Sequence, residues 1–261
     1  MRGHSPSPRP LSSLRVTDSA GIPWSGRHFE HADSSGDDGS APPELIAAIG
    51  RFRSGELGET DVVDALRGAR LLIPLVARLG TDGLNEHGGE KRQELSIVTV
   101  AGPDGRTVMP VFSSVAAMAR WNPSARPVPA TGPRVALAAV AEGTDLVIVD
   151  PTSETEFVIR RPALEAMARQ RAWVPSHVDP EVLRVFQDAA AAERTPVAVR
   201  LSPGDPAARL AGPELVVTLV LAPGLDSAAL ESLITRQRER WATSAVIASR
   251  VDSIRIALDT A

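Results

Sequence analysis

The sequence predicts an α+β protein, with a mixed α/β N-terminal part and a small α-β-β-α-β sandwich near its C-terminal end. Two observations predict this class. Apolar runs of strand length alternate with helical patterns, and several of the helical patterns open at proline, which is favoured in a first turn. Hydrophobic residues make up 43% of the 261 positions, and because aromatic residues make up only 3%, aliphatic side chains must fill the core.

The composition divides the chain into three segments. Residues 1–41 are rich in Ser, Pro, Gly and Asp with few periodic apolar positions, so we expect a disordered tail. Residues 42–175 form the first expected domain. A boundary is expected near residues 173–176, and residues 176–261 form the second domain, a small α+β unit.

In the first domain, each expected helix follows a proline or a capping residue, and each expected strand is a short apolar run. Pro74 lies inside one such run, which predicts an edge position or a bulge. Residues 102–105 predict a turn within a β-hairpin, and residues 123–133 predict a proline-rich loop. The expected helices begin at Pro43, at Asp61 with Thr60 as N-cap, at Ser113 or Ser114, at Val135 and at Pro162. The expected strands are 71–76, 95–100, 107–112, 146–149 and 157–159.

In the second domain, Asp179, Pro180 and Glu181 give a helix start: an N-cap, a proline and an acid in the first turn. Asp226 is expected to cap a second helix over 227–241. Strands are expected at 197–201 and 215–221, and one or two final strands at 245–256. This order predicts helices on one face of an antiparallel sheet.

Charge and cysteine content narrow the function classes. The net charge of −4 argues against a nucleic-acid partner, which normally needs a basic face. The absence of cysteine excludes disulfides and thiolate catalysis. No apolar run is long enough to span a bilayer, and no hydrophobic segment of a secretory signal follows Arg2 and Arg9, so we expect a cytoplasmic location and no membrane partner.

Five residues are candidates for ligand or partner contacts: Ser113, Ser114, Trp121, Asp150 and Pro151. Asp150 and Pro151 follow a buried strand, where binding sites often lie and where turns also form. The two serines suggest a nucleophile, a helix cap or an anion site, and the capping interpretation is favoured because no nucleophile elbow surrounds them. Trp121 suits either a partner-facing anchor or a lid on the core.

The remaining polar clusters predict no catalytic, cofactor or metal site. His28 and His31 have a spacing that could hold a metal on a helix, but they fall in the expected tail. His87 and His177 have no second ligand at a recognisable spacing. Two basic clusters, residues 160–161 and 236–240, complete the set, and the second alternates in sign as a solvated helix face does.

Several blocks resemble the N-terminal domain of the SseB family. They are 65–74, the Asp104-Gly105-Arg106 turn before Met109-Pro110-Val111-Phe112-Ser113-Ser114, Trp121, 125–129, and Asp150-Pro151. The resemblance covers roughly residues 42–175 and implies an SseB-like fold there. The family is named for enhanced serine sensitivity, and the resemblance implies neither a defined activity nor catalytic residues. The family usually has Thr where this chain has Ser113, which keeps the hydroxyl.

Three functions follow as hypotheses. The first is a non-catalytic regulatory or adaptor module that binds a protein partner through the N-terminal domain, with no cofactor. The second is a sensor of an amino acid or another anionic metabolite, bound near Asp150 and Ser113. The third is an enzyme, which would need at least two convergent ionisable groups in a closed pocket.

Overall fold

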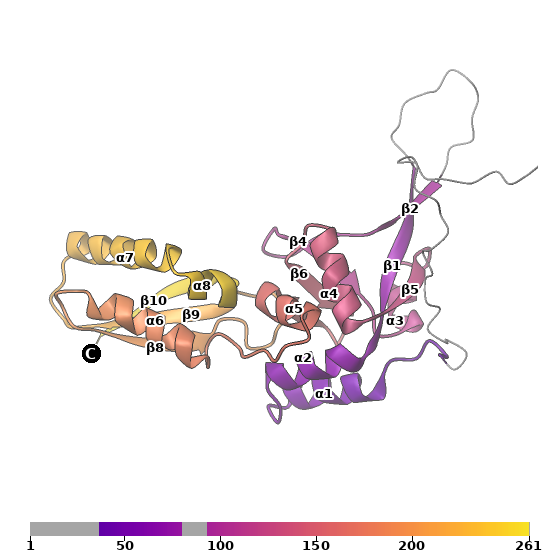
Figure 1. The fold of residues 1–261 in the computed structure, drawn as a ribbon, viewed down its shortest axis with the longest axis horizontal. Helices are drawn as coiled ribbons and strands as arrows, with labels where there is room; N and C mark the ends of the chain where they lie inside the picture. Colours follow the sequence, from indigo (N-terminus) through magenta and orange to yellow (C-terminus); the bar gives the residue numbers. More distant parts are fainter. Residues whose placement is uncertain (1–36, 80–92, 261) are drawn as a thin grey trace, which may run out of the picture. The chain divides into compact units, whose positions relative to one another are not determined.

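The structure is a computed structural model that describes residues 37–79 and 93–260 (Figure 1). The expected α+β class is confirmed, because the described helices and strands build three separate sheets, mixed or antiparallel, with helices packed on them. The chain from Gly39 onward forms one compact unit. The tail expected at residues 1–41 lies almost wholly outside the described residues, and the boundary expected at 173–176 stays a prediction.

Two helices open the described chain. Helix α1 (Pro43–Arg53) begins at the expected proline, and α2 (Glu59–Gly68) follows after a short turn. The expected cap of α2 is wrong: Thr60 lies inside the first turn and Gly58 is the N-cap. The carboxylate of Asp61 accepts the N–H of Gly58 at 2.9 Å, so an acid inside the helix satisfies the backbone before it.

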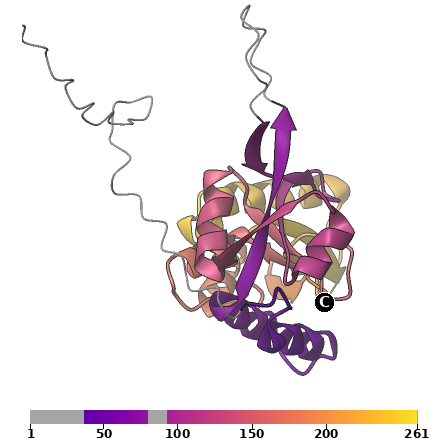
Figure 2. The same ribbon diagram turned by 90° about the vertical axis from the view of Figure 1, so that its right-hand side faces the viewer.

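The first sheet has the order β2-β1-β5, with β1 (Arg70–Leu79) as its long central strand (Figure 2). Strand β2 (Gln93–Ile97) pairs with residues 75–79 of β1, and β5 (Arg126–Thr131) pairs with residues 70–75, both antiparallel. The sequence predicted a loop at residues 123–133, and this prediction is wrong for residues 126–131, which form β5. Pro127 and Pro129 are two residues apart, so their backbone nitrogens face the same side of β5. That side is the outer edge of the sheet, where the missing N–H groups cost no hydrogen bond to another strand.

Pro74 belongs to a central strand and not to an edge, yet it removes no ladder hydrogen bond. The N–H and C=O of Leu72 both bond to Phe112, so Leu72 points away from β5. Pro74, two residues later, points the same way. It falls between the bridge at Leu72 and the start of the pairing with β2 at Leu75. The missing N–H therefore faces a gap in the ladder.

The second sheet has the order β3-β4-β6-β7, and its hairpin and buried strands are confirmed. Strands β4 and β6 are parallel, whereas β6 and β7 are antiparallel. The main core joins one face of these strands to α1, α2, α4 and α5. The elements are β3 (Val100–Ala101), β4 (Thr107–Val111), β6 (Leu146–Val149), β7 (Phe157–Arg160), α3 (Val115–Trp121), α4 (Gly132–Ala141) and α5 (Arg161–Ala168).

The third sheet has the order β10-β9-β8, and helices α6, α7 and α8 pack on one face of it. Two expectations for this region are wrong. Residues 245–250 form a helix, because the hydroxyl of Ser244 accepts the N–H of Ile247 and caps it. The sheet is also mixed, since α7 and α8 carry the chain back so that β10 runs parallel to β9. The elements are α6 (Pro180–Ala191), β8 (Val197–Pro203), β9 (Leu215–Leu221), α7 (Ser227–Ala242), α8 (Ala245–Arg250) and β10 (Ile254–Thr260).

Candidate functional site

Ser113 and Asp150, expected separately from the sequence, lie in direct contact. Strands β4 and β6 are parallel neighbours that end in register at Val111 and Val149, so the residues after them meet at one edge of the sheet. The backbone N–H of Ser113 donates to one carboxylate oxygen of Asp150 at 2.8 Å, and its hydroxyl donates to the other at 2.6 Å. Both residues are buried, with Asp150 only 1% exposed.

Asp150 also organises the turn that follows β6. The hydroxyl of Thr155 donates to its carboxylate at 2.8 Å, and the hydroxyl of Ser153 donates to its backbone carbonyl at 2.7 Å. Asp150 has a φ of 45°, a left-handed conformation that aspartate tolerates better than most residues. Pro151 lies inside this turn and is partly buried.

Ser114 caps α3, as one of the sequence interpretations proposed. Its hydroxyl accepts the N–H of Ala117 at 3.1 Å. The hydroxyls of Ser113 and Ser114 are thus both committed to hydrogen bonds within the fold. Ser113 is 2% exposed, so a substrate could not reach its hydroxyl without a change in the fold.

Trp121, at the end of α3, packs against Phe112, the residue before Ser113. Their ring centroids are 5.2 Å apart at an angle of 40°. With Leu72 and Met118 they form a small apolar cluster under α3. Trp121 is half-buried, so it closes this cluster and still presents part of its indole ring to solvent.

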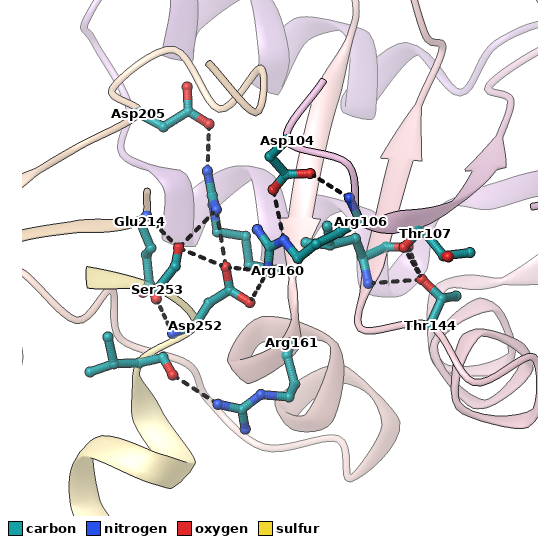
Figure 3. A network of polar contacts seen from close by, with 12 residues as sticks. Asp104, Arg106, Thr107, Thr144, Arg160, Arg161, Asp205, Glu214, Asp252 and Ser253 are labelled. Carbon is teal, nitrogen blue, oxygen red and sulfur yellow. Dashed lines mark hydrogen bonds and ion pairs between the residues drawn. The ribbon is translucent and has the colours of Figure 1, made fainter. Parts of the chain in front are cut away.

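A second polar centre surrounds Arg160, the last residue of β7 (Figure 3). Arg160 is 8% exposed, and its guanidinium donates to Asp205 at 2.8 Å and to Asp252 at 3.0 Å. It also donates to the carbonyl of Gly212 at 2.8 Å. Asp252 forms a second ion pair, with Arg106 at 2.9 Å. The network joins β7 to residues that lie 45 to 92 positions later in the chain.

The acids around Arg160 have shifted pKa values of opposite sign. Burial raises the pKa of Glu59 to about 7, and repulsion from Glu214 adds to this shift. Burial likewise raises the pKa of Glu214. Burial also disfavours the charged form of Asp252, but hydrogen bonds and attraction from Arg106 and Arg160 outweigh it and lower the pKa. The centre therefore places one carboxylate with a lowered pKa, Asp252, beside two with raised pKa values, Glu59 and Glu214.

Sequence reasoning missed this network, since it treated Arg160 only as half of a basic pair. The partners of Arg160 are too distant in sequence to form a recognisable spacing. One signal was available: a charged residue ends a fully buried strand, and a buried guanidinium requires carboxylate partners. Arg161 has a carboxylate partner on its own helix, Glu165 at 3.1 Å, and it also donates to the carbonyls of Ala248 and Val251, both at 2.8 Å.

Metal binding finds no support in the part of the chain that the structure describes, where no group of three His, Asp or Glu side chains could hold an ion. His28, His31 and His87 lie outside the described residues. His177 is described, and burial lowers its pKa. Across residues 37–79 and 93–260, no helix combines the length and the apolar character that crossing a membrane requires.

The comparisons with known proteins agree with the resemblance read from the sequence. Residues 44–166 match the family model of the SseB protein N-terminal domain. This range contains Ser113, Ser114, Trp121, Asp150 and Arg160. Neither the comparison with curated proteins nor that with solved structures gave a match.

Proposed function

We propose that this chain, whose residues 44–166 match the SseB protein N-terminal domain, acts in the cytoplasm as a non-catalytic regulatory or adaptor module that binds a protein partner. The observation that carries the proposal is the position of Trp121. Its ring is held against Phe112 and is still partly exposed on α3. A pre-positioned, partly exposed tryptophan is typical of the residues that dominate protein interfaces.

The surroundings of Trp121 support a contact surface. Pro127 and Pro129 of β5 are exposed, and they lie opposite Pro74 and Leu72 of β1. Because opposite residues share a sheet face, the two prolines lie on the face where Leu72 packs under α3. We call Trp121, Pro127 and Pro129 the Trp121 surface. Its members are rigid, so binding would cost little conformational entropy.

The hydrogen bonds of Asp150 support a non-catalytic role for the second part of the candidate site. A general base needs a carboxylate that is free to take a proton from a substrate. The Asp150 carboxylate is buried and accepts three hydrogen bonds from Ser113 and Thr155. An anionic metabolite, as in the sensor hypothesis, would have to displace this carboxylate from the N–H of Ser113.

The test is affinity capture of the tagged full chain from its native cytoplasm, with mass spectrometry of what is retained. We expect one stoichiometric partner, and a Trp121→Ala chain should bind it about 30-fold more weakly, the size of an interface hot spot. Val178→Ala is the matched control, since Val178 is 60% exposed and lies outside the Trp121 surface. Thermal unfolding of each variant separates lost binding from lost folding.

Two results would overturn the proposal. One is a partner that binds the Trp121→Ala chain as tightly as the original chain. The other is an empty capture together with a thermal shift on adding an amino acid or anionic metabolite, which would favour the sensor. A ligand at 100 times its Kd should stabilise the chain by about 2.7 kcal/mol.

A further inference from the structure

The outer edge of β10 carries backbone groups that no described strand pairs with. Strand β10 pairs in parallel with β9 at one end of the third sheet. The carbonyl of Ser253 accepts the N–H of Leu215 in β9, so Ser253 faces β9, and by alternation the odd-numbered residues of β10 do the same. The peptide groups that point outward belong to Ile254, Ile256, Leu258 and Thr260.

Two of the outer strands, β5 and β10, differ in how their edges are protected. In β5, the residues whose peptide groups face outward include Pro127 and Pro129, which have no N–H to donate. Proline in an outer strand is a common protection against unwanted strand pairing. Strand β10 contains no proline, and its edge presents both donors and acceptors at Ile254, Ile256 and Leu258, while the N–H of Thr260 donates to Asp259. An open edge of this kind is suited to pairing with another strand.

Two hollows lie along β10, and both are lined by side chains of α7 as well. One, of about 560 Å³, is lined by Trp241 of α7, Ile247 of α8, and Ile254 and Ile256. The other, of about 330 Å³, is lined by Leu230 of α7 and by Leu258, which is 46% exposed. Apolar side chains of an added strand would have space beneath α7 on both sides of the centre of β10.

We propose that two copies of this chain associate through β10, paired antiparallel in a register centred on Ala257. In this register Ile256 lies opposite Leu258 of the second copy, and Arg255 lies opposite Asp259 of the second copy. Ile256 and Leu258 both point their peptide groups outward, so they form the hydrogen-bonded pairs. Ala257 meets its own equivalent, where a small side chain suits close approach.

Charge complementarity selects this register among the symmetric ones. A register centred on Ile256 places Ala257 opposite Arg255 of the second copy, and one centred on Leu258 places it opposite Asp259. In both registers Arg255 and Asp259 no longer face each other. Moving it to Arg255 or to Asp259 places like charges directly opposite each other, which is destabilising. Within one copy the Asp259 carboxylate already pairs with Arg200 of β8, so in the dimer it would lie between Arg200 and Arg255 of the second copy. This surface is separate from the Trp121 surface, so the inference goes beyond the proposed function.

Charge reversal tests the register directly. We expect the full chain to sediment as a concentration-dependent dimer. Arg255→Asp and Asp259→Arg, each alone, should weaken the dimer about tenfold, because each places like charges opposite one another twice. An equimolar mixture of the two variants should recover the dimer, since opposite charges then face across the interface. The double variant R255D/D259R should recover it as well.

The outcomes are decisive because Arg255 and Asp259 are exposed and their replacement leaves the core intact. Circular dichroism on each variant checks that the fold is unchanged. A full chain that stays monomeric at every concentration would overturn the proposal. So would a dimer that both single reversals leave unchanged, or one that the mixture fails to restore.

Discussion

Ser113 binds both oxygens of the Asp150 carboxylate, one through its backbone N–H and one through its hydroxyl. The contact connects the ends of two parallel strands, β4 and β6, that are 37 residues apart in sequence at this point. Two residues that the sequence presented as separate candidates for ligand contacts therefore bind each other. Their arrangement explains why a hydroxyl is needed at position 113.

Replacing Ser113 by Ala should lower the free energy of unfolding by about 1–3 kcal/mol, because a buried carboxylate loses a donor. Ser113→Thr is the matched control and should change it much less, since the hydroxyl is kept. Chemical denaturation with matched buffers measures both. Equal losses in the two variants would contradict a hydrogen-bonding role for the hydroxyl.

Arg160→Met should destabilise the chain by about 3–5 kcal/mol, since removing the buried cation leaves Asp205 without an ion pair and Asp252 with Arg106 alone. The two carboxylates affected are those of Asp205 and Asp252, with side chains 3% and 2% exposed. Arg169→Met is the control: its side chain is 62% exposed, and its ion pair with Glu165 should contribute less than about 1 kcal/mol. Similar effects of the two substitutions on the denaturation midpoint would show that the network contributes little.

Glu59 should make part of the stability depend on pH. Its pKa is raised from 4.5 to about 7 in the folded chain, so between these values the folded state binds more protons than the unfolded state. The stability that Glu59 contributes is therefore present below about pH 4.5 and is lost as the pH rises through about 7. Glu59→Gln should remove this dependence and leave the variant more stable than the original chain at pH 8.

The free energy of unfolding of the original chain and of Glu59→Gln, measured by denaturation from pH 4.5 to 8, checks this prediction. The quantity to compare is the difference between the two chains at each pH. Taking this difference removes the pH dependence that other acids contribute equally to both chains. Asp179 is one such acid, because hydrogen bonds and attraction from Arg250 outweigh its burial and lower its pKa. The stability gain of Glu59→Gln should grow with pH. A gain that is constant over this range would mean that Glu59 titrates normally.

The prolines of β5 should limit association through that edge. In the Asp259→Arg chain, Pro127→Thr together with Pro129→Thr supplies two outward N–H groups, and we expect larger assemblies by light scattering. Val128→Thr is the control, because Val128 lies between the two prolines and its peptide group faces β1. If both changes leave the particle size unaltered, the prolines have another role.

Local signals in the sequence predicted most of the fold. The caps at Asp179 and Asp226 are both confirmed, because Asp179 accepts the N–H groups of Glu181 and Val182, and Asp226 accepts the N–H of Ala229. Strand β5 and helix α8 were misread for a related reason. Proline suggested a loop and the β-branched residues Val246 and Ile247 suggested a strand, whereas neighbouring strands and the Ser244 cap decided both.

The candidate site divides in the same way. The sequence predicted a helix cap at Ser113 or Ser114, of which Ser114 is the cap in the structure, and it placed Asp150 correctly at a strand end. Its partnership with Ser113 depends on β4 and β6 being parallel neighbours, which is a property of the sheet. The partners of Arg160 depend on three-dimensional proximity throughout, and no spacing in the sequence contains that information.

The pairing of Arg160 with Asp205 and Asp252 bears on fragment design. Residues 44–166 match a family domain, yet the carboxylates that neutralise Arg160 are encoded downstream of that match. If the domain were excised, or joined to a foreign C-terminal segment, β7 would end in Arg160 without the carboxylates of Asp205 and Asp252 to neutralise it. A functional exchange must move the arginine and its acids together or substitute all three with apolar side chains.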